Sequence, residues 1–153
     1  MPAGTRVPDF DLETSGGGKL TSGDLQGRQT VLFFYPKDDT PGCTIEGQEF
    51  TRLYKEFQAK GVDVFGVSPD SPRSHDRFVD KCSLGIPLVS DPQRVLIEGM
   101  DLWREKTFAG RTYMGVERST FLIGPDGVVQ REWRAVKAPG HAAEVLEAVS
   151  AGA

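Results

Sequence analysis

The chain alternates between short apolar runs and longer amphipathic stretches. Residues Thr30–Tyr35 show no polar alternation, which is typical of a strand covered on both faces. Between Cys43 and Lys60 the apolar side chains recur with the spacing of one helix face, which predicts a helix. The pattern predicts these further elements: strands at Val62–Val67 and Ile86–Ser90, helices at Arg73–Cys82 (with Pro72 in its first turn), Gln93–Leu102 and His141–Val149, and hairpins formed by Asp9–Glu13 with Lys19–Thr21 and by Thr120–Ile123 with Val128–Trp133. This order of elements indicates an α/β fold with a parallel βαβ unit and an N-terminal hairpin extension.

The size and charge of the chain narrow the possible partners and compartments. A chain of 153 residues is expected to form one domain over 1–153. The 22 acidic residues exceed the 18 basic ones, and no basic cluster occurs, so neither nucleic acid nor a membrane surface is an expected partner. The longest apolar run, Val31–Tyr35, is too short to cross a bilayer, and residues 1–10 lack the apolar region of a signal peptide. We therefore expect a cytoplasmic protein.

Cys43 lies at a position that favours a reactive thiol. It follows Thr40-Pro41-Gly42 between the apolar strand and the amphipathic helix, which places it in the first helical turn. The unpaired amides and the positive end of the helix dipole stabilise a thiolate there, and the thiolate is the nucleophilic form of cysteine. A buried structural cysteine near a helix start is the alternative interpretation.

The residues around Cys43 add a specific pattern. Pro36, Thr40 and Cys43 are spaced P-x-x-x-T-x-x-C, and Arg118 enters a later predicted strand. This combination resembles the active-site pattern of the peroxiredoxins, and within that family the chain is most similar to the peroxiredoxin Q, or bacterioferritin comigratory protein, group. The resemblance extends over nearly the whole chain through these segments: Val7–Phe10, Tyr35–Asp38, Pro41–Thr44, Val67–Asp70, Pro87–Asp91 and Glu117–Ile123.

The resemblance implies a thioredoxin-like fold, with a central mixed β-sheet flanked by helices, and the reduction of hydrogen peroxide or organic hydroperoxides without a cofactor or metal. It also implies that Cys43 becomes a sulfenic acid, that the Thr40 hydroxyl and the Cys43 amide bind peroxide, that Arg118 holds the thiolate, and that Pro36 shields the site. Attack on an O–O bond needs such donors to receive the developing charge. Taken singly, Thr40 is equally explained as a helix cap, Pro36 as a strand stop and Arg118 as a surface charge. A monomer recycled by thioredoxin or a similar dithiol is expected.

Three further features near the motif have simpler interpretations. Glu46 could pair with Arg118 or Lys37, but we expect it to act as a favourable charge near the helix start. The segment Lys37–Asp39 is expected to be a solvated loop without a catalytic step. The stretch Lys106–Glu117 could form part of a substrate mouth or a subunit contact, and the sequence does not decide between these two roles.

The role of the second cysteine is open. Many members of the group carry a resolving cysteine five residues after the peroxidatic one, but Gln48 occupies that position here. Other members carry it on the next helix, where Cys82 lies, although the alignment places the family's position closer to Val79. We expect Cys82 to resolve Cys43 as an intramolecular disulfide, which would require local unfolding because the Cα atoms must approach within about 7 Å. A core cysteine, and a one-cysteine enzyme that uses an external thiol, are the alternatives.

Other chemistries fit the sequence less well. A disulfide reductase needs C-x-x-C, but the residue three positions after Cys43 is Glu46. A cysteine–histidine hydrolase would need His75 or His141 as a base, and both are expected to be structural. The cysteines and histidines do not have the spacing of a zinc finger. A non-enzymatic binding or holdase protein on the same scaffold is the alternative from another class.

Overall fold

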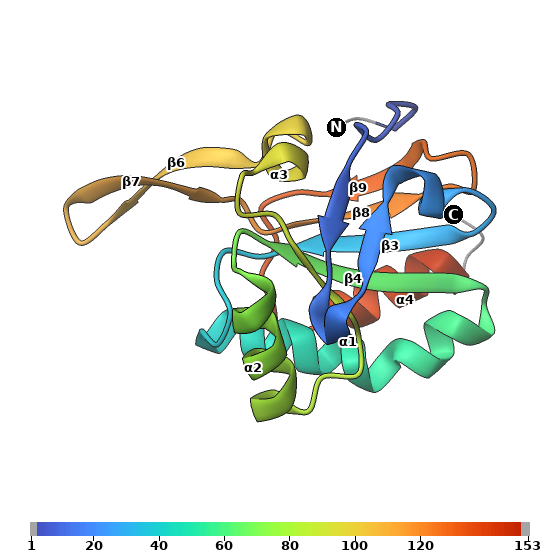
Figure 1. The fold of residues 1–153 in the computed structure, drawn as a ribbon, viewed down its shortest axis with the longest axis horizontal. Coiled ribbons are helices and arrows are strands. Elements are labelled where there is room, and N and C mark those ends of the chain that lie inside the picture. Colours follow the sequence, from blue (N-terminus) through green and yellow to red (C-terminus); the bar gives the residue numbers. More distant parts are fainter. Residues whose placement is uncertain (1–2, 151–153) are drawn as a thin grey trace.

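A five-stranded mixed sheet forms the centre of the protein, whose computed structural model describes residues 3–150 (Figure 1). The strands, in their order across the sheet, are β5 (Leu88–Ser90), β4 (Val62–Ser68), β3 (Gln29–Phe34), β8 (Ser119–Ile123) and β9 (Val129–Trp133). β3 and β5 run parallel to β4, whereas β8 is antiparallel to both β3 and β9. The predicted βαβ unit and the hairpin of β8 with β9 are therefore confirmed.

The sheet is covered on both faces, as the unbroken apolar run of β3 predicted. Val31 and Phe33 belong to one core, together with side chains of α1 (Pro41–Ala59) and α4 (His141–Ser150). Figure 1 shows these two helices together below the strands. Leu32 and Phe34 point to a second core, which contains N-terminal side chains and those of α3 (Val95–Gly99). Successive side chains of β3 are therefore buried on opposite faces of the sheet, which anchors the strand. The end of β3 leads into the loop before α1.

The helices that flank β4 agree with the sequence pattern. α1 begins at Pro41, two residues before the predicted start, because proline is favoured in a first helical turn. α2 (Pro72–Cys82) has the predicted bounds. The Ser71 side chain caps α2 by accepting a hydrogen bond of 3.1 Å from the amide of Ser74.

Two hairpins form two-stranded sheets outside the central sheet. The N-terminal one is confirmed: β1 (Asp11–Glu13) is antiparallel to β2 (Lys19–Thr21), with the short helix η1 (Ser15–Gly17) between them and η2 (Ser22–Leu25) after them. The second, β6 (Trp103–Phe108) with β7 (Arg111–Val116), projects far from the body (Figure 1). Near its tip, Phe108 is 74% exposed.

The predicted helix over Gln93–Leu102 is mostly wrong, since only the five residues of α3 are α-helical. The carboxylate of Asp91 accepts hydrogen bonds of 2.8–2.9 Å from three successive amides at the start of α3. Arg94 before the helix and Asp101 after it both have left-handed backbone angles, with φ of 60° and 62°. The apolar spacing that suggested a longer helix therefore marks side chains of the second core.

Within residues 3–150, no helix combines the length and apolar character needed to cross a membrane.

Candidate active site

Cys43 is the third residue of α1 and its side chain is buried. Thr44 donates the first helical hydrogen bond, 2.8 Å to the Thr40 carbonyl. The amides of Gly42 and Cys43 therefore precede the helical ladder and point out of its N-terminal end. The sulfur lies where these amides and the helix dipole favour negative charge.

Arg118 approaches the sulfur from the segment between β7 and β8. Its Nη2 donates to Cys43 Sγ at 3.2 Å, and its Nη1 donates to Glu46 Oε1 at 2.6 Å. A Cβ atom on Gly42 would lie only 3.1 Å from Nη2, so glycine at this position leaves room for the guanidinium. Burial lowers the pKa of Arg118, but the charges of Glu46 and Cys43 outweigh it and raise the pKa overall. Arg118 is therefore a permanent cation at the thiol.

Glu46 is a buried partner of Arg118, so our expectation of a simple helix-start charge is wrong. Its side chain has no exposed surface. Burial raises the pKa of Glu46 from 4.5 to about 7, although the charge and hydrogen bond of Arg118 act in the opposite direction. Among residues 3–150, no hydrogen-bond partner reaches the second carboxyl oxygen, Oε2. Glu46 orients the guanidinium by holding one of its nitrogens while the other faces sulfur.

Thr40 and Pro36 lie on the loop that leads from β3 to the thiol. Thr40 occupies the N-cap position of α1, but its side chain does not cap the helix. Its hydroxyl instead donates to the Lys37 carbonyl at 2.8 Å, which leaves the hydroxyl oxygen able to accept a hydrogen bond from a hydroperoxide. Pro36 is half-buried two residues after β3.

The same loop contains a residue that the sequence analysis placed wrongly. We expected Asp38 to be solvated, but its side chain is only 4% exposed and contacts His75 of α2 at 2.7 Å. Lys37 and Asp39 are exposed, as expected. No local sequence pattern distinguishes Asp38 from these neighbours, because its partners come from a distant helix.

Lys106 brings a second positive charge toward the site from β6. Its side chain is half-buried. Burial and the charge of Arg118 lower the pKa of Lys106, while the charges of Cys43 and Glu117 act to raise it. The Lys106 position on the β6–β7 hairpin is therefore within electrostatic reach of Cys43 and Arg118, whereas Phe108 near the tip is exposed.

Both histidines are engaged elsewhere, which agrees with a structural role. His75 places its ring nitrogens 2.7 Å from Asp38 Oδ2 and 3.0 Å from the Val89 carbonyl. His141 contacts Glu144 and the Thr120 hydroxyl, and burial lowers its pKa. Neither ring has a free nitrogen to act as a base for Cys43. In the described part of the chain, no group of three potential metal ligands occurs.

Cys82 is the last residue of α2, half-buried, and packs against the core that contains Cys43. Both thiols are free. The residues after Cys82 lie beside later turns of α1: Leu84 is next to Gly47, and the Gly85 amide donates to the Thr51 hydroxyl at 3.0 Å. Gly47 and Thr51 are about 6 and 12 Å further along the helix than Cys43, since each residue rises about 1.5 Å. The structure therefore holds α2 beside α1 with the two sulfurs unbonded.

Comparison with known proteins identifies the family. Residues 3–132 match the model of the AhpC/TSA family. The chain belongs to this family. Peroxiredoxin Bcp of Xanthomonas campestris is 46% identical over 153 residues, covering 100% of this chain and 94% of the relative. The structure of a bacterioferritin comigratory protein from the same organism, studied for its alkyl peroxide reduction activity, has a TM-score of 0.91 at 43% identity and covers 99% of both chains. A peroxiredoxin Q variant from Xylella fastidiosa has a TM-score of 0.94 at 42% identity, covering 99% of this chain and 97% of the other.

These relatives confirm two predictions made from the sequence. The chain is a peroxiredoxin of the Bcp or peroxiredoxin Q group, and its fold is thioredoxin-like. It is accordingly a thiol-dependent peroxidase. A non-enzymatic holdase is therefore not needed to explain the scaffold.

Proposed function

We propose that Cys43 is the peroxidatic residue and reduces hydrogen peroxide and organic hydroperoxides. Its thiolate attacks one peroxide oxygen, so that an S–O bond forms while the O–O bond breaks. The second oxygen leaves with a proton as water or an alcohol, and Cys43 becomes a sulfenic acid. The observation that carries this proposal is the Arg118 guanidinium, which donates to Cys43 Sγ at 3.2 Å.

The neighbouring groups supply the remaining interactions. The amide of Cys43 and the hydroxyl of Thr40 hold the peroxide, and the charge of Arg118 stabilises both the thiolate and the oxygen that leaves. Charged and polar groups that are fixed in this way before the reaction lower the barrier without reorganisation. Pro36 covers the loop side of the site and limits the access of water.

We also propose that Cys82 resolves the sulfenic acid. The Cys82 sulfur attacks Cys43 Sγ, an S–S bond forms, the S–O bond breaks, and the hydroxyl of the sulfenic acid leaves as water with the proton of the Cys82 thiol. A dithiol such as thioredoxin then opens the disulfide by thiolate attack. The two free thiols on segments packed in one core support this assignment. The enzyme is proposed to work as a cytoplasmic monomer of a single domain.

Mass spectrometry after stoichiometric peroxide tests these assignments on the wild type and on Cys82→Ser. We expect the wild type to lose two hydrogens and Cys82→Ser to hold a sulfenic acid at Cys43, which dimedone captures. Thioredoxin with its reductase should restore two thiols in the wild type. Oxygen addition at Cys43 with Cys82 free would mean a one-cysteine enzyme that uses an external thiol. Cys43→Ser is the control: peroxide consumption that persisted in it would refute the peroxidatic assignment.

A further inference from the structure

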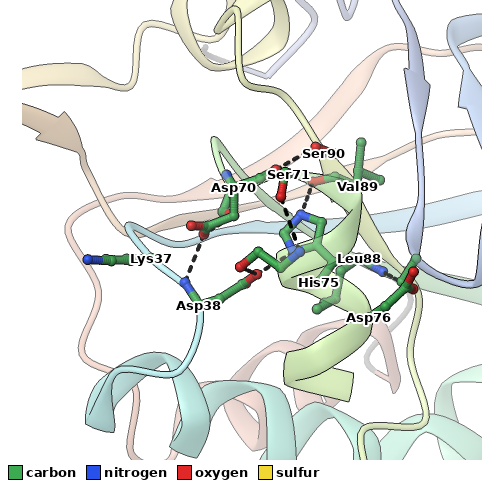
Figure 2. A network of polar contacts seen from close by, with 12 residues as sticks. Lys37, Asp38, Asp70, Ser71, His75, Asp76, Leu88, Val89 and Ser90 are labelled. Carbon is green, nitrogen blue, oxygen red and sulfur yellow. Dashed lines mark hydrogen bonds and ion pairs between the residues drawn. The ribbon is translucent and has the colours of Figure 1, made fainter. Parts of the chain in front are cut away.

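The loop before α1 is tied to α2 through a buried carboxylate. Asp38 Oδ1 accepts from the Tyr35 hydroxyl at 2.6 Å, and Oδ2 accepts from the Ser74 hydroxyl at 2.8 Å and contacts His75 Nδ1 at 2.7 Å. We call these four residues the Asp38 cluster. Figure 2 shows Asp38 on the loop and His75 on the helix pointing toward each other. Burial and the Asp38 charge raise the pKa of Tyr35 well above its ordinary value, so its hydroxyl remains a donor.

The strand ends behind the cluster hold its two central members in place. His75 Nε2 lies 3.0 Å from the Val89 carbonyl, and since a carbonyl only accepts, this nitrogen carries a hydrogen. The Asp38 amide donates to Asp70 Oδ2 at 2.8 Å (Figure 2), and the Ser68 hydroxyl donates to the same oxygen at 2.7 Å. The loop, α2 and the ends of β4 and β5 therefore meet in one polar network.

Polar contacts join the loop to this side of α2, in addition to the packing of the Tyr35 ring against Phe78, whose centroids are 6.2 Å apart. A cavity of about 690 Å³ lies between them, and most of the side chains that line it are charged or polar. At the far end of α2, Lys81 Nζ pairs with Asp39 Oδ2 at 2.8 Å, but both side chains are largely exposed and such pairs contribute little. The buried Asp38 cluster is thus the stronger of the two attachments.

The cluster joins the two segments that carry the thiols. Asp38 lies five residues before Cys43, and His75 lies seven residues before Cys82 on the same helix. Because Leu84 and Gly85 pack one and two turns beyond Cys43 along α1, Cys82 reaches Cys43 only if the chain moves. Release of α2 from the loop would separate Ser74 and His75 from Asp38 and expose these groups to water.

We propose that the Asp38 cluster is a latch that keeps α2 docked, and that its release limits the rate at which Cys82 attacks oxidised Cys43. Its members are positioning residues, since none of them touches the reacting sulfur. The latch prolongs the state in which Cys43 is in place to meet peroxide, at the cost of slower disulfide formation. This proposal rests on the proposed resolving role of Cys82.

Ser74→Ala tests the latch with little risk to the fold. Alanine forms helices at least as well as serine, so faster movement of α2 in this variant reports the lost contact with Asp38 and not a weaker helix. Ser22→Ala is the matched control. Ser22 is also a half-buried serine, and its hydroxyl accepts a hydrogen bond from the Phe10 amide, but it lies at the N-terminal hairpin and not at α2. Asp38→Ala removes the whole latch, whereas Asp38→Asn keeps groups able to bond Tyr35 and Ser74.

The measurement separates the two chemical steps. Reduced protein is mixed with peroxide, quenched with acid at intervals, and the sulfenic acid and disulfide forms are counted by mass. In Ser74→Ala we expect disulfide formation, which does not depend on peroxide concentration, to accelerate about 5- to 10-fold, as expected for the loss of one hydrogen bond of ordinary strength. The peroxide-dependent first step should stay within about twofold of the wild type, a difference of under about 0.5 kcal/mol. Asp38→Ala should resolve at least as fast as Ser74→Ala, Asp38→Asn should return toward the wild-type rate, and Ser22→Ala should match the wild type.

Two results would overturn the latch, and they are distinguishable. If the wild type forms the disulfide but Ser74→Ala and Asp38→Ala resolve at the wild-type rate or more slowly, the latch is wrong and the resolving role of Cys82 stands. If the wild type forms no Cys43–Cys82 disulfide, both proposals fail. At excess peroxide, the latch also predicts less sulfinic acid at Cys43 in Ser74→Ala, since faster resolution competes with further oxidation.

Discussion

The buried ion pair of Glu46 with Arg118 makes stability depend on pH, and Glu46→Gln tests this. The pKa of Glu46 rises on folding from 4.5 to about 7, chiefly because burial disfavours the charged carboxylate. The folded protein therefore binds this proton more tightly than the unfolded chain. This tighter binding of the proton stabilises the folded protein. The stabilisation is fully present below about pH 4.5 and is lost as the pH rises through about 7.

The size of the effect follows from the same shift. One pKa unit corresponds to about 1.4 kcal/mol, so deprotonation of Glu46 lowers the free energy of unfolding by about 2–3 kcal/mol as the pH rises from about 5 to about 8. Glutamine stays neutral and can still accept a bond from Arg118 through its amide oxygen. The free energy of unfolding of Glu46→Gln, relative to the wild type, should therefore increase by about 2–3 kcal/mol across this range.

Urea unfolding of the reduced protein at several pH values, followed by tryptophan fluorescence, measures this difference. Glu98→Gln is the control, because Glu98 also pairs with an arginine, Arg94 at 3.1 Å, but is 52% exposed. Its stability should run parallel to that of the wild type at every pH. If the free energies of unfolding of Glu46→Gln and the wild type change in parallel with pH as well, burial does not control the protonation of Glu46 and the reasoning is refuted.

Variants at three further positions test the site and the sheet. Arg118→Lys should lower the rate of peroxide consumption about 10²- to 10³-fold, because an ammonium group lacks the planar fork that reaches both Cys43 and Glu46; a stopped-flow rate near that of the wild type would contradict this role. Thr40→Val should lower the same rate about 10²-fold through loss of the hydroxyl, whereas Thr40→Ser should retain most of it; equal rates in the two variants would exclude the hydroxyl. Gly66→Ala should lower the free energy of unfolding by about 1–3 kcal/mol in urea, because the added Cβ would lie 2.8 Å from Leu88 Cδ2; an unchanged midpoint would show that the core yields freely.

Features with a local cause could be predicted from the sequence. The apolar run of β3 predicted a strand buried on both faces, and the position of Pro72 predicted the start of α2. The position of Cys43 in a first helical turn followed from the strand before it and the amphipathic helix after it. The sequence also contained the P-x-x-x-T-x-x-C spacing on which the resemblance depends.

Features that depend on distant partners could not be predicted. Glu46 and Arg118 are 72 residues apart, so nothing in the helix pattern distinguishes a buried partner from an exposed charge. The segment around Asp38 has the polar composition of a solvated loop, and Asp38 is enclosed only because α2 docks against it. The apolar spacing over Gln93–Leu102 suggested a helix, but the carboxylate of Asp91 and left-handed residues limited α3 to five residues.

The sequence by itself determined the strands of the central sheet and of the N-terminal hairpin, the main helices and the placement of the thiol at a helix start, because these depend on side-chain periodicity and on turn residues close along the chain. The sequence indicated Arg118 only through the family resemblance, and the tertiary structure decided which charges are buried around the thiol and the loop before it. Arg118 comes to Cys43 from beyond a long hairpin, and Asp38 is held by α2. A charged side chain is buried only when folding supplies its partner, and for these residues the partner lies tens of residues away.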